Sequence, residues 1–308
     1  DEHPQILEPF VHQGITTIVT GNCGYSTAPI NPETLELLKV QTSFLQAAEL
    51  QWEWLDMGGY MDFIEKRGVA YNVVPLVSHG AIRTYVKGFS GGPATDSEKQ
   101  EMARLAREAM EQGVFGLSGG LIYPPGAYSD TDELIAISRP LKEFGGVFTC
   151  HIRGEGKTLL PATEEIIKVG EQNGIGVHHS HLSAFGEEYW PKIDHVLRLH
   201  DQARARGVDI TLDVIPYTAA NTTLSALFPA WSVGEGVGKL IERLKDSEVR
   251  SRINIKVTGW EGTVILSVAS AANKRFEGKT LAQIGEETGK TPFNVAADLM
   301  AVSYTHLR

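Results

Sequence analysis

Two stretches of the sequence decide the fold: residues 145–156 read GGVFTCHIRGEG, and residues 174–182 read GIGVHHSHL. Each begins with glycine, continues into a short apolar run typical of a buried strand, and reaches histidine where that run ends. Between them, Ala162–Asn173 carries apolar residues at helical spacing. A strand, a helix and a second strand in succession predict two parallel strands joined by a right-handed crossover.

The same alternation recurs over the first part of the chain. Further helices are expected at Ser97–Glu111, with Asp96 as N-cap, and at Tyr189–Arg206. Six strand–helix units in about 200 residues predict most of an eight-stranded α/β barrel, an incomplete (β/α)8 TIM barrel. The expected strands are Ile15–Thr20, Ala70–Val77, Phe115–Ser118, Gly146–His151, Gly176–His181 and Val208–Ile215.

The pattern changes after Tyr217. No linker rich in proline, serine or glycine separates the later residues, so residues 1–302 are predicted to form one partial barrel domain with a helical insertion at about 224–260. Residues 303–308, SYTHLR, do not continue the amphipathic pattern and are interpreted as a non-native tail. The elements expected after Tyr217 are a helix at Lys239–Asp246, a strand at Ile253–Val257, and helices at Thr280–Gly289 and Pro292–Met300.

Composition is that of a globular enzyme, with 42% hydrophobic and 21% charged residues among 308. The net charge of −10 argues against nucleic acid or an anionic membrane as partner and leaves a small molecule. Two cysteines are too few for a disulfide framework, so both are expected to be reduced, in a cytoplasmic protein. His12, His195 and His200 fall on helical patterns and are expected at the surface.

Three residues meet the requirements of a zinc site at the carboxyl ends of parallel strands. His151 and His181 end two expected strands, and Cys23 follows a third inside GNCGYS. Two of the three have an alternative interpretation: Cys23 as a small buried apolar residue, and His151 as a strand-end histidine bonded to a carbonyl. Strand alternation puts Cys150 on the opposite face from His151, and places His179 one layer deeper than His181.

Five stretches together resemble the D-aminoacylase (N-acyl-D-amino-acid deacylase) family of the amidohydrolase superfamily. They are GITTIVTGNCGYSTAP, GVFGLSGGLIYPPG, HIRGEG, HHSHLSAFG and DVIPYTAANTTL, in this order. The resemblance implies a (β/α)8 barrel beside a small β-sandwich, the latter largely missing here. It also implies hydrolysis of the amide bond of N-acyl-D-amino acids.

The resemblance assigns the tightly held zinc to Cys23, His151 and His181. It implies that a water activated by the metal attacks the amide carbonyl, with an aspartate on the eighth strand as general base. That aspartate is expected beyond the C-terminus, and the HxH motif of the first strand is expected upstream of Asp1. Neither His3 nor Asp298 is a substitute for these residues.

Candidate substrate-binding residues lie in the same motifs: Arg153, Tyr217, Thr223, Tyr123, Ser183 and His79. The alternatives are a salt bridge of Arg153 with Glu155, a rigid proline-rich turn at Tyr123 and a structural role for His79. Two positions depart from the family. Ser183 stands where a lysine is usual, and Gly154 where asparagine or aspartate is usual, so recognition of an ordinary D-amino-acid carboxylate is in question.

Two other functions are compatible with parts of the sequence. A cyclic-amide hydrolase of the dihydroorotase or hydantoinase kind usually needs a bridging lysine on the fourth strand, and no lysine occurs from Phe115 to Tyr128. The second is a truncated, catalytically silent chain that binds metal. Zinc content and turnover separate these possibilities.

Overall fold

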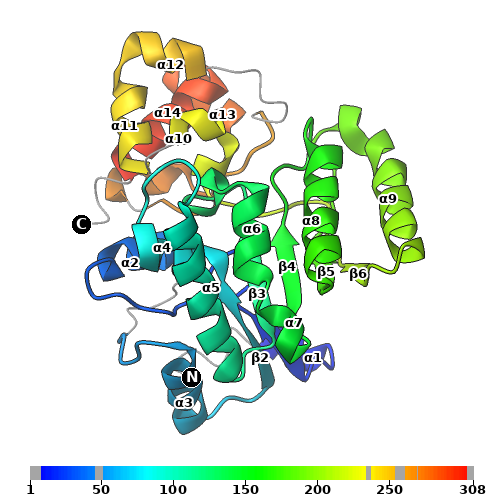
Figure 1. Ribbon diagram of the computed structural model, residues 1–308. Coiled ribbons are helices and arrows are strands. Elements are labelled where there is room, and N and C mark those ends of the chain that lie inside the picture. Colours follow the sequence, from blue (N-terminus) through cyan, green and yellow to red (C-terminus); the bar gives the residue numbers. More distant parts are fainter. Residues whose placement is uncertain (1–7, 46–50, 234–236, 254–260, 269, 304–308) are drawn as a thin grey trace. The chain divides into compact units, whose positions relative to one another are not determined.

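The computed structural model describes residues 8–45, 51–233, 237–253, 261–268 and 270–303 (Figure 1). The chain divides into two compact units, residues 1–218 and residues 219–308. The predicted extent of one barrel domain over 1–302 stays a prediction. Among the described residues, no helix is long and apolar enough to cross a membrane.

The first unit is built on one parallel sheet whose six strands follow the order of the sequence (Figure 1). All six predicted strands are present, with shorter or shifted bounds. The strands are β1 Thr17–Thr20, β2 Asn72–Ser78, β3 Gly116–Gly120, β4 Val147–His151, β5 Gly176–His179 and β6 Ile210–Leu212. Sequential order in an all-parallel sheet is the arrangement expected of consecutive barrel strands.

Helices pack side by side along this sheet, in the order α4, α5, α6, α8 and α9 (Figure 1). A continuous apolar core lies between them and the strands, and it includes Leu117, Phe148 and Ile166, all fully buried. The helices of the first unit are α1 Glu8–His12, α2 Leu35–Thr42, η2 Ser43–Leu45, α3 Met57–Arg67, α4 His79–Lys87, α5 Asp96–Glu111, η3 Gly126–Tyr128, α6 Thr131–Ser138, α7 Leu141–Phe144, α8 Leu159–Asn173, η4 Glu187–Lys192 and α9 Ile193–Ala205.

Two helix boundaries differ from the sequence prediction for local reasons. The N-cap of α5 is Thr95, not Asp96, because Thr95 and Glu98 form a capping box in which each side chain bonds the other residue's backbone N–H. The predicted helix Tyr189–Arg206 divides into η4 and α9, with Pro191 in η4. Proline has no N–H to donate to an α-helical hydrogen bond.

The second unit is helical and has its own apolar core, which includes Leu240, Leu281 and Ala296. An isolated antiparallel bridge joins Val264 and Thr280. Its helices are η5 Leu224–Leu227, α10 Ala230–Val233, α11 Val237–Lys245, α12 Ser247–Ile253, η6 Ala271–Phe276, α13 Leu281–Thr288 and α14 Pro292–Ser303.

The predicted helices of this unit are confirmed. In the predicted strand Ile253–Val257, Ile253 instead ends α12, and the other residues lie outside the described part of the chain. Of the predicted tail, Ser303 ends α14, and residues 304–308 also lie outside the described residues.

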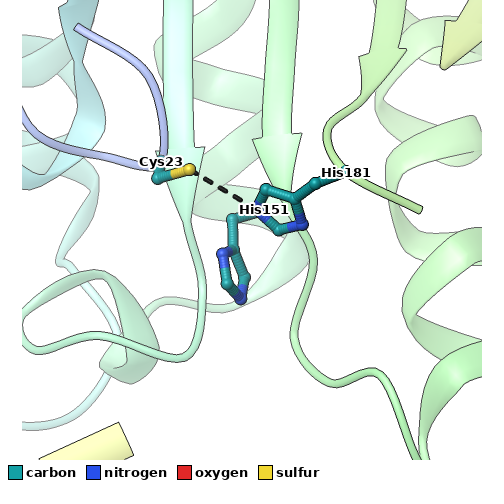
Figure 2. Close-up of side chains that lie close together, drawn as sticks. All are labelled: Cys23, His151 and His181. Atoms are coloured by element: carbon teal, nitrogen blue, oxygen red, sulfur yellow. Dashed lines mark hydrogen bonds between the residues drawn. The ribbon is translucent and has the colours of Figure 1, made fainter. Parts of the chain in front are cut away.

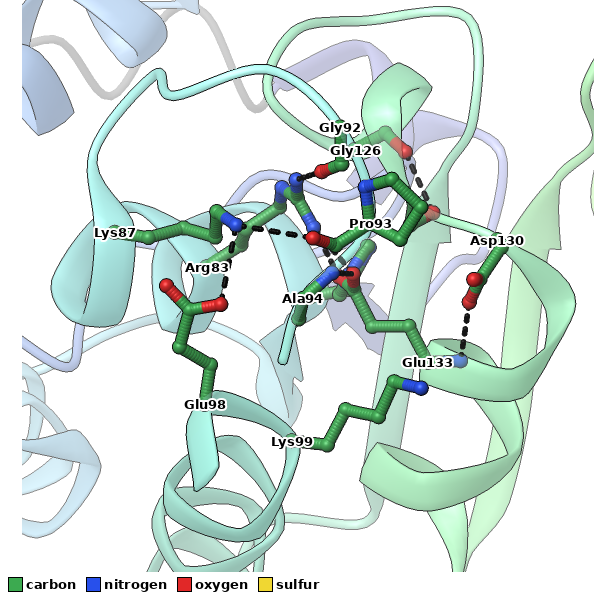
Figure 3. A network of polar contacts seen from close by, with 12 residues as sticks. Arg83, Lys87, Gly92, Pro93, Ala94, Glu98, Lys99, Gly126, Asp130 and Glu133 are labelled. Carbon is green, nitrogen blue, oxygen red and sulfur yellow. Dashed lines mark hydrogen bonds and ion pairs between the residues drawn. The ribbon is translucent and has the colours of Figure 1, made fainter. Parts of the chain in front are cut away.

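A buried ion network joins α4 to α6 in the first unit (Figure 3). The Glu133 carboxylate accepts a hydrogen bond from the Arg83 guanidinium and lies 2.8 Å from His79 Nε2, and all three side chains are fully buried. Arg83 also donates to the carbonyl of Gly92 at 2.6 Å, and the Ala94 N–H donates to Glu133 at 3.1 Å. The network therefore connects residues 92–94 to helices α4 and α6.

Burial alone would raise the pKa of Glu133, but hydrogen bonds and charges from His79 and Arg83 outweigh it and lower the pKa from 4.5 to about 2. Glu133→Gln should lower the free energy of unfolding by about 3–5 kcal/mol, because it leaves the buried Arg83 without its counter-charge. Urea unfolding at neutral pH measures this. Glu111→Gln, at an exposed position, is the control and should change stability by less than about 0.5 kcal/mol.

The same variant tests the acid stability of the fold. Because the pKa of Glu133 is lower in the folded chain, its contribution is complete above pH 4.5 and is lost as pH falls toward 2. Wild type should lose about 3 kcal/mol from this group over that window, a loss that Glu133→Gln no longer shows. Acid-unfolding profiles that fall in parallel for the two proteins would contradict this assignment.

Candidate metal centre

Three side chains from separate elements meet at the carboxyl ends of the strands (Figure 2). Cys23 lies three residues beyond the end of β1, His151 is the last residue of β4, and His181 follows β5. One ligand atom from each lies within 4.8 Å of the other two. Cys23 Sγ lies 3.5 Å from His181 Nε2, and the two imidazole rings have centroids 4.3 Å apart. The sequence-predicted triad is therefore brought together.

Glycines let the Cys23 loop approach the neighbouring strands closely. Gly21 and Gly24 have φ of +82° and +78°, in the left-handed region that favours glycine. A Cβ on Gly120, the last residue of β3, would lie 1.9 Å from the Cys23 carbonyl oxygen. The Ser118 hydroxyl closes the arrangement, since it accepts from the Gly24 N–H at 3.2 Å and donates to the Gly21 carbonyl. Backbone contact with β3 thus sets the place of the thiol.

His151 is buried and its imidazole makes no hydrogen bond in the described part of the chain. The residue is 6% exposed. Burial, together with the nearby His181, lowers its pKa from 6.5 to about 4, so the ring is neutral at physiological pH. A neutral imidazole with a free lone pair is the form that coordinates metals.

His181 is held from two sides. Its backbone N–H donates to the Asp213 carboxylate, and its ring Nδ1 lies 3.1 Å from Glu155 Oε1. Burial lowers its pKa, but contacts with Cys23 and Glu155 outweigh that effect and raise the pKa to about 10. The His181 ring thus lies between the Cys23 sulfur and the Glu155 carboxylate.

Both loop ligands have an unusual backbone conformation. Cys23 has φ of 54° and His181 has φ of 39°, and they are the non-glycine residues with positive φ in the described chain. Such conformations are costly for residues with a Cβ and concentrate at functional sites. The strand β5 also ends at His179, so the alternation that was expected to put His179 and His181 on one face does not extend to His181.

Tyr123 and Ser183, two predicted substrate-binding residues, lie near this cluster. The Tyr123 ring is 9% exposed, with its centroid 5.0 Å from that of His151. Ser183 bonds Glu155 through its hydroxyl. The structure therefore places both beside the ligands, one against His151 and one behind His181.

Arg153 is engaged elsewhere. Its guanidinium pairs with Glu165, at 3.0 Å from Nε and 3.1 Å from Nη2, and donates to the Ala127 carbonyl at 3.3 Å. The alternative salt bridge with Glu155 is wrong, because Glu165 on α8 takes that place. An Arg153 that binds a substrate carboxylate would have to exchange this partner.

The other predicted substrate-binding residues are more dispersed. His79 is fully buried in the Glu133 network, and this contact agrees with its structural interpretation. Tyr217 is 75% exposed near the end of the first unit. Thr223 belongs to the second unit, with its hydroxyl 3.0 Å from that of Ser225.

The surface prediction is confirmed for His12 and His195, which are exposed. The surface prediction for His200 is wrong: it is fully buried, with Nε2 3.2 Å from His179 Nδ1, because this face of α9 packs toward β5. His178 lies on the opposite face of β5 and contacts Thr211 at 2.8 Å. Cys150 is fully buried in the core, as predicted.

Glu155, Asp213 and Ser118 were not assigned to the site from the sequence. Glu155 stands within HIRGEG and Asp213 opens DVIPYTAANTTL, so both lie in motifs already singled out. Their contacts with His181 depend on loop conformation, which residue spacing does not specify. The sequence feature that could have indicated them is that an acidic residue follows the end of each of two strands, Glu155 after β4 and Asp213 after β6.

Curated proteins are similar to this chain over about 70% of its length. The chain is 35% identical over 222 residues to a D-aminoacylase of Alcaligenes xylosoxydans xylosoxydans, and 36% identical over 227 residues to an N-acyl-D-aspartate deacylase of the same organism. The matches cover 71% and 72% of this chain and 44% of each relative. The chain thus spans less than half the length of the curated relatives it matches. No protein-family model matches it.

Solved structures agree with the fold. A D-aminoacylase crystal structure that defines a subset of amidohydrolases matches with a TM-score of 0.72 and 28% identity, over 94% of this chain and 54% of that one. An N-acyl-D-glutamate deacylase from Bordetella bronchiseptica, complexed with zinc and a phosphonate inhibitor, matches with a TM-score of 0.73 and 27% identity, over 95% and 54%.

The curled, incomplete parallel barrel places the chain in the amidohydrolase superfamily, to which the matching solved structures belong. The predicted incomplete (β/α)8 barrel is confirmed. Within that superfamily, the curated proteins and solved structures that the chain resembles are D-aminoacylases and N-acyl-D-amino-acid deacylases.

Gly120→Ala tests the contact that places Cys23. The added methyl should displace the Cys23 loop, lower the free energy of unfolding by about 1–3 kcal/mol and speed the reaction of the Cys23 thiol with a thiol reagent. Cys150 is buried and should stay silent in this assay. Gly91→Ala is the matched control, since a Cβ there meets nothing within 4 Å. Equal thiol reactivity in the two variants would contradict the proposed contact.

Proposed function

We propose that Cys23, His151 and His181 hold a zinc ion, and that this centre serves hydrolysis of the amide bond of N-acyl-D-amino acids or related linear amides. One observation carries the proposal. Three donor atoms converge within 4.8 Å, and the buried His151 has both ring nitrogens unpartnered in the described part of the chain. A buried polar group without a partner is costly unless a ligand completes it.

The chemistry of the donors fits zinc. One thiolate and two imidazoles are ligands that zinc accepts, and three protein ligands leave a position open, as in catalytic zinc sites. The same soft donors also suit copper. The solved relatives include one complexed with zinc and a D-aminoacylase mutant in complex with copper chloride. We favour zinc because it is common in hydrolytic sites with such ligands.

Side chains around the ligands suggest how the site is organised. When bound, the metal would supply Lewis acidity for attack of water on an amide carbonyl. Tyr123 packs against His151, and this contact supports our assignment of Tyr123 to the acyl group of the substrate. Ser183 is assigned to substrate contact through its position beside Glu155. Arg153, Tyr217, Thr223 and His79 stay as predicted contacts with weaker support from their positions.

The relatives' names point to small N-acylated amino acids as substrates, and we propose the same class here. We also propose a cytoplasmic protein, since Cys23 and Cys150 are both free thiols, which are typical of reducing compartments. The net charge of −10 supports a small-molecule partner over nucleic acid or an anionic membrane.

Metal binding can be tested by ligand substitution. Cys23→Ala and His151→Ala should release zinc under dialysis conditions in which wild type retains one ion per chain, because each removes a ligand. Elemental analysis after dialysis measures this. Cys150→Ala and His195→Ala are the matched controls, since neither residue belongs to the cluster and His195 is exposed on α9, and both should retain zinc. Release from the controls as well would argue against the assigned site.

Activity should be tested with the complete product of the gene that encodes these 308 residues. We expect release of free amino acid from N-acetyl-D-amino acids, loss of turnover with a chelator and recovery with zinc. A panel of N-acyl-D- and N-acyl-L-amino acids measures selectivity. Faster cleavage of the L-series would refute D-selectivity, and retained zinc without hydrolysis of any linear amide would favour a silent metal-binding protein.

A further inference from the structure

His181 has different neighbours at its two ring nitrogens. Nε2 lies 3.5 Å from Cys23 Sγ, within the cluster of three ligands, whereas Nδ1 lies 3.1 Å from Glu155 Oε1 (Figure 2 shows the cluster side). The ligand group contains Cys23, His151 and His181 but not Glu155. The carboxylate therefore lies behind His181, at the ring edge that faces away from the other ligands.

Glu155 is itself held in place. Its side chain is 19% exposed and is bonded by the Ser183 hydroxyl, and its backbone carbonyl accepts from the Phe185 N–H at 2.8 Å. The neighbouring Arg153 does not neutralise it, because Arg153 pairs with Glu165. In the described part of the chain, the ion pair of Glu155 is with His181. A carboxylate that is fixed in this way can orient the histidine ring with which it pairs.

We propose that Glu155 is a positioning residue that fixes the tautomer and the ring orientation of His181. His181 Nδ1–H donates to Glu155, which leaves the Nε2 lone pair to face Cys23 and the metal. A carboxylate behind a ligand histidine orients the ring and increases its basicity, and loss of such a partner typically costs ~10–100-fold in metal affinity. The inference rests on the proposed metal site.

Asp213 contacts the backbone of His181 and not its ring. Its carboxylate accepts the backbone N–H of His181 and pairs with His178 at 3.2 Å. It thus supports the positive φ of His181 without contacting the ring nitrogen. Of these two carboxylates, Glu155 is the one that contacts Nδ1, the atom whose protonation decides which nitrogen coordinates.

The test is zinc affinity, measured on the full chain by competition with a chromophoric chelator. Glu155→Gln should weaken zinc binding ~10–100-fold, with retained circular dichroism, and Co²⁺ bound in its place should show altered d–d absorption. Glu164→Gln, an exposed neighbour on α8 that carries the same charge change, should bind as wild type. In a His181→Ala background, Glu155→Gln should cause no further loss, because its effect passes through His181.

A measurement on the unaltered protein covers the case in which Glu155→Gln does not fold. In ¹⁵N-histidine NMR of the zinc-loaded chain, His181 should carry its proton on Nδ1 and coordinate through Nε2. Coordination through Nδ1, or wild-type zinc affinity in Glu155→Gln, would overturn the inference while leaving the metal site intact. A wild-type chain that binds no zinc would overturn both proposals.

Discussion

The close approach of Gly120 on β3 to the carbonyl of Cys23 is the constraint on which the site depends. A side chain at Gly120 would overlap the Cys23 carbonyl oxygen, and one at Gly24 would reach within 2.6 Å of Gly120 N. Glycine at both positions lets the loop after β1 lie directly against β3. Because β3 pairs with β4 so that Gly120 lies opposite His151, this contact brings the thiol and the buried imidazole to one edge of the sheet. The ligand cluster is a consequence of backbone packing.

The three residues of the cluster differ in backbone conformation. His151 ends a regular strand and needs no strained backbone conformation, whereas Cys23 and His181 both have positive φ. Such residues persist only where their surroundings hold them. Ser118 bonds both sides of the Cys23 loop, and Asp213 binds the backbone N–H of His181. Cys23 is thus supported by a side chain on β3, and His181 by a side chain just after β6. These contacts with the sheet stabilise the two strained backbone conformations.

The sequence allowed the strands and the strand-end histidines to be predicted, because apolar runs bounded by glycine have a strong local signal. Cys23 was ambiguous from its glycines alone, since the contact with Gly120 joins residues 97 positions apart. The burial of His200 was missed because the choice of helix face depends on packing against β5. Arg153 was given the wrong alternative partner for a similar reason: Glu165 reaches it from α8, whereas Glu155, nearer in sequence, turns to His181.

The charge of the site is the last link between the fold and its chemistry. The Glu155 carboxylate contacts the His181 ring at Nδ1, the Asp213 carboxylate accepts the His181 backbone N–H, and Cys23 Sγ lies 3.5 Å from Nε2. Contacts with Cys23 and Glu155 raise the pKa of His181 to about 10 despite burial. Burial and the charge of His181 lower the pKa of His151 to about 4. In the proposed site, a cation would be held by His181 Nε2 and by the buried His151 ring, whose nitrogens have no hydrogen-bond partner among the described residues.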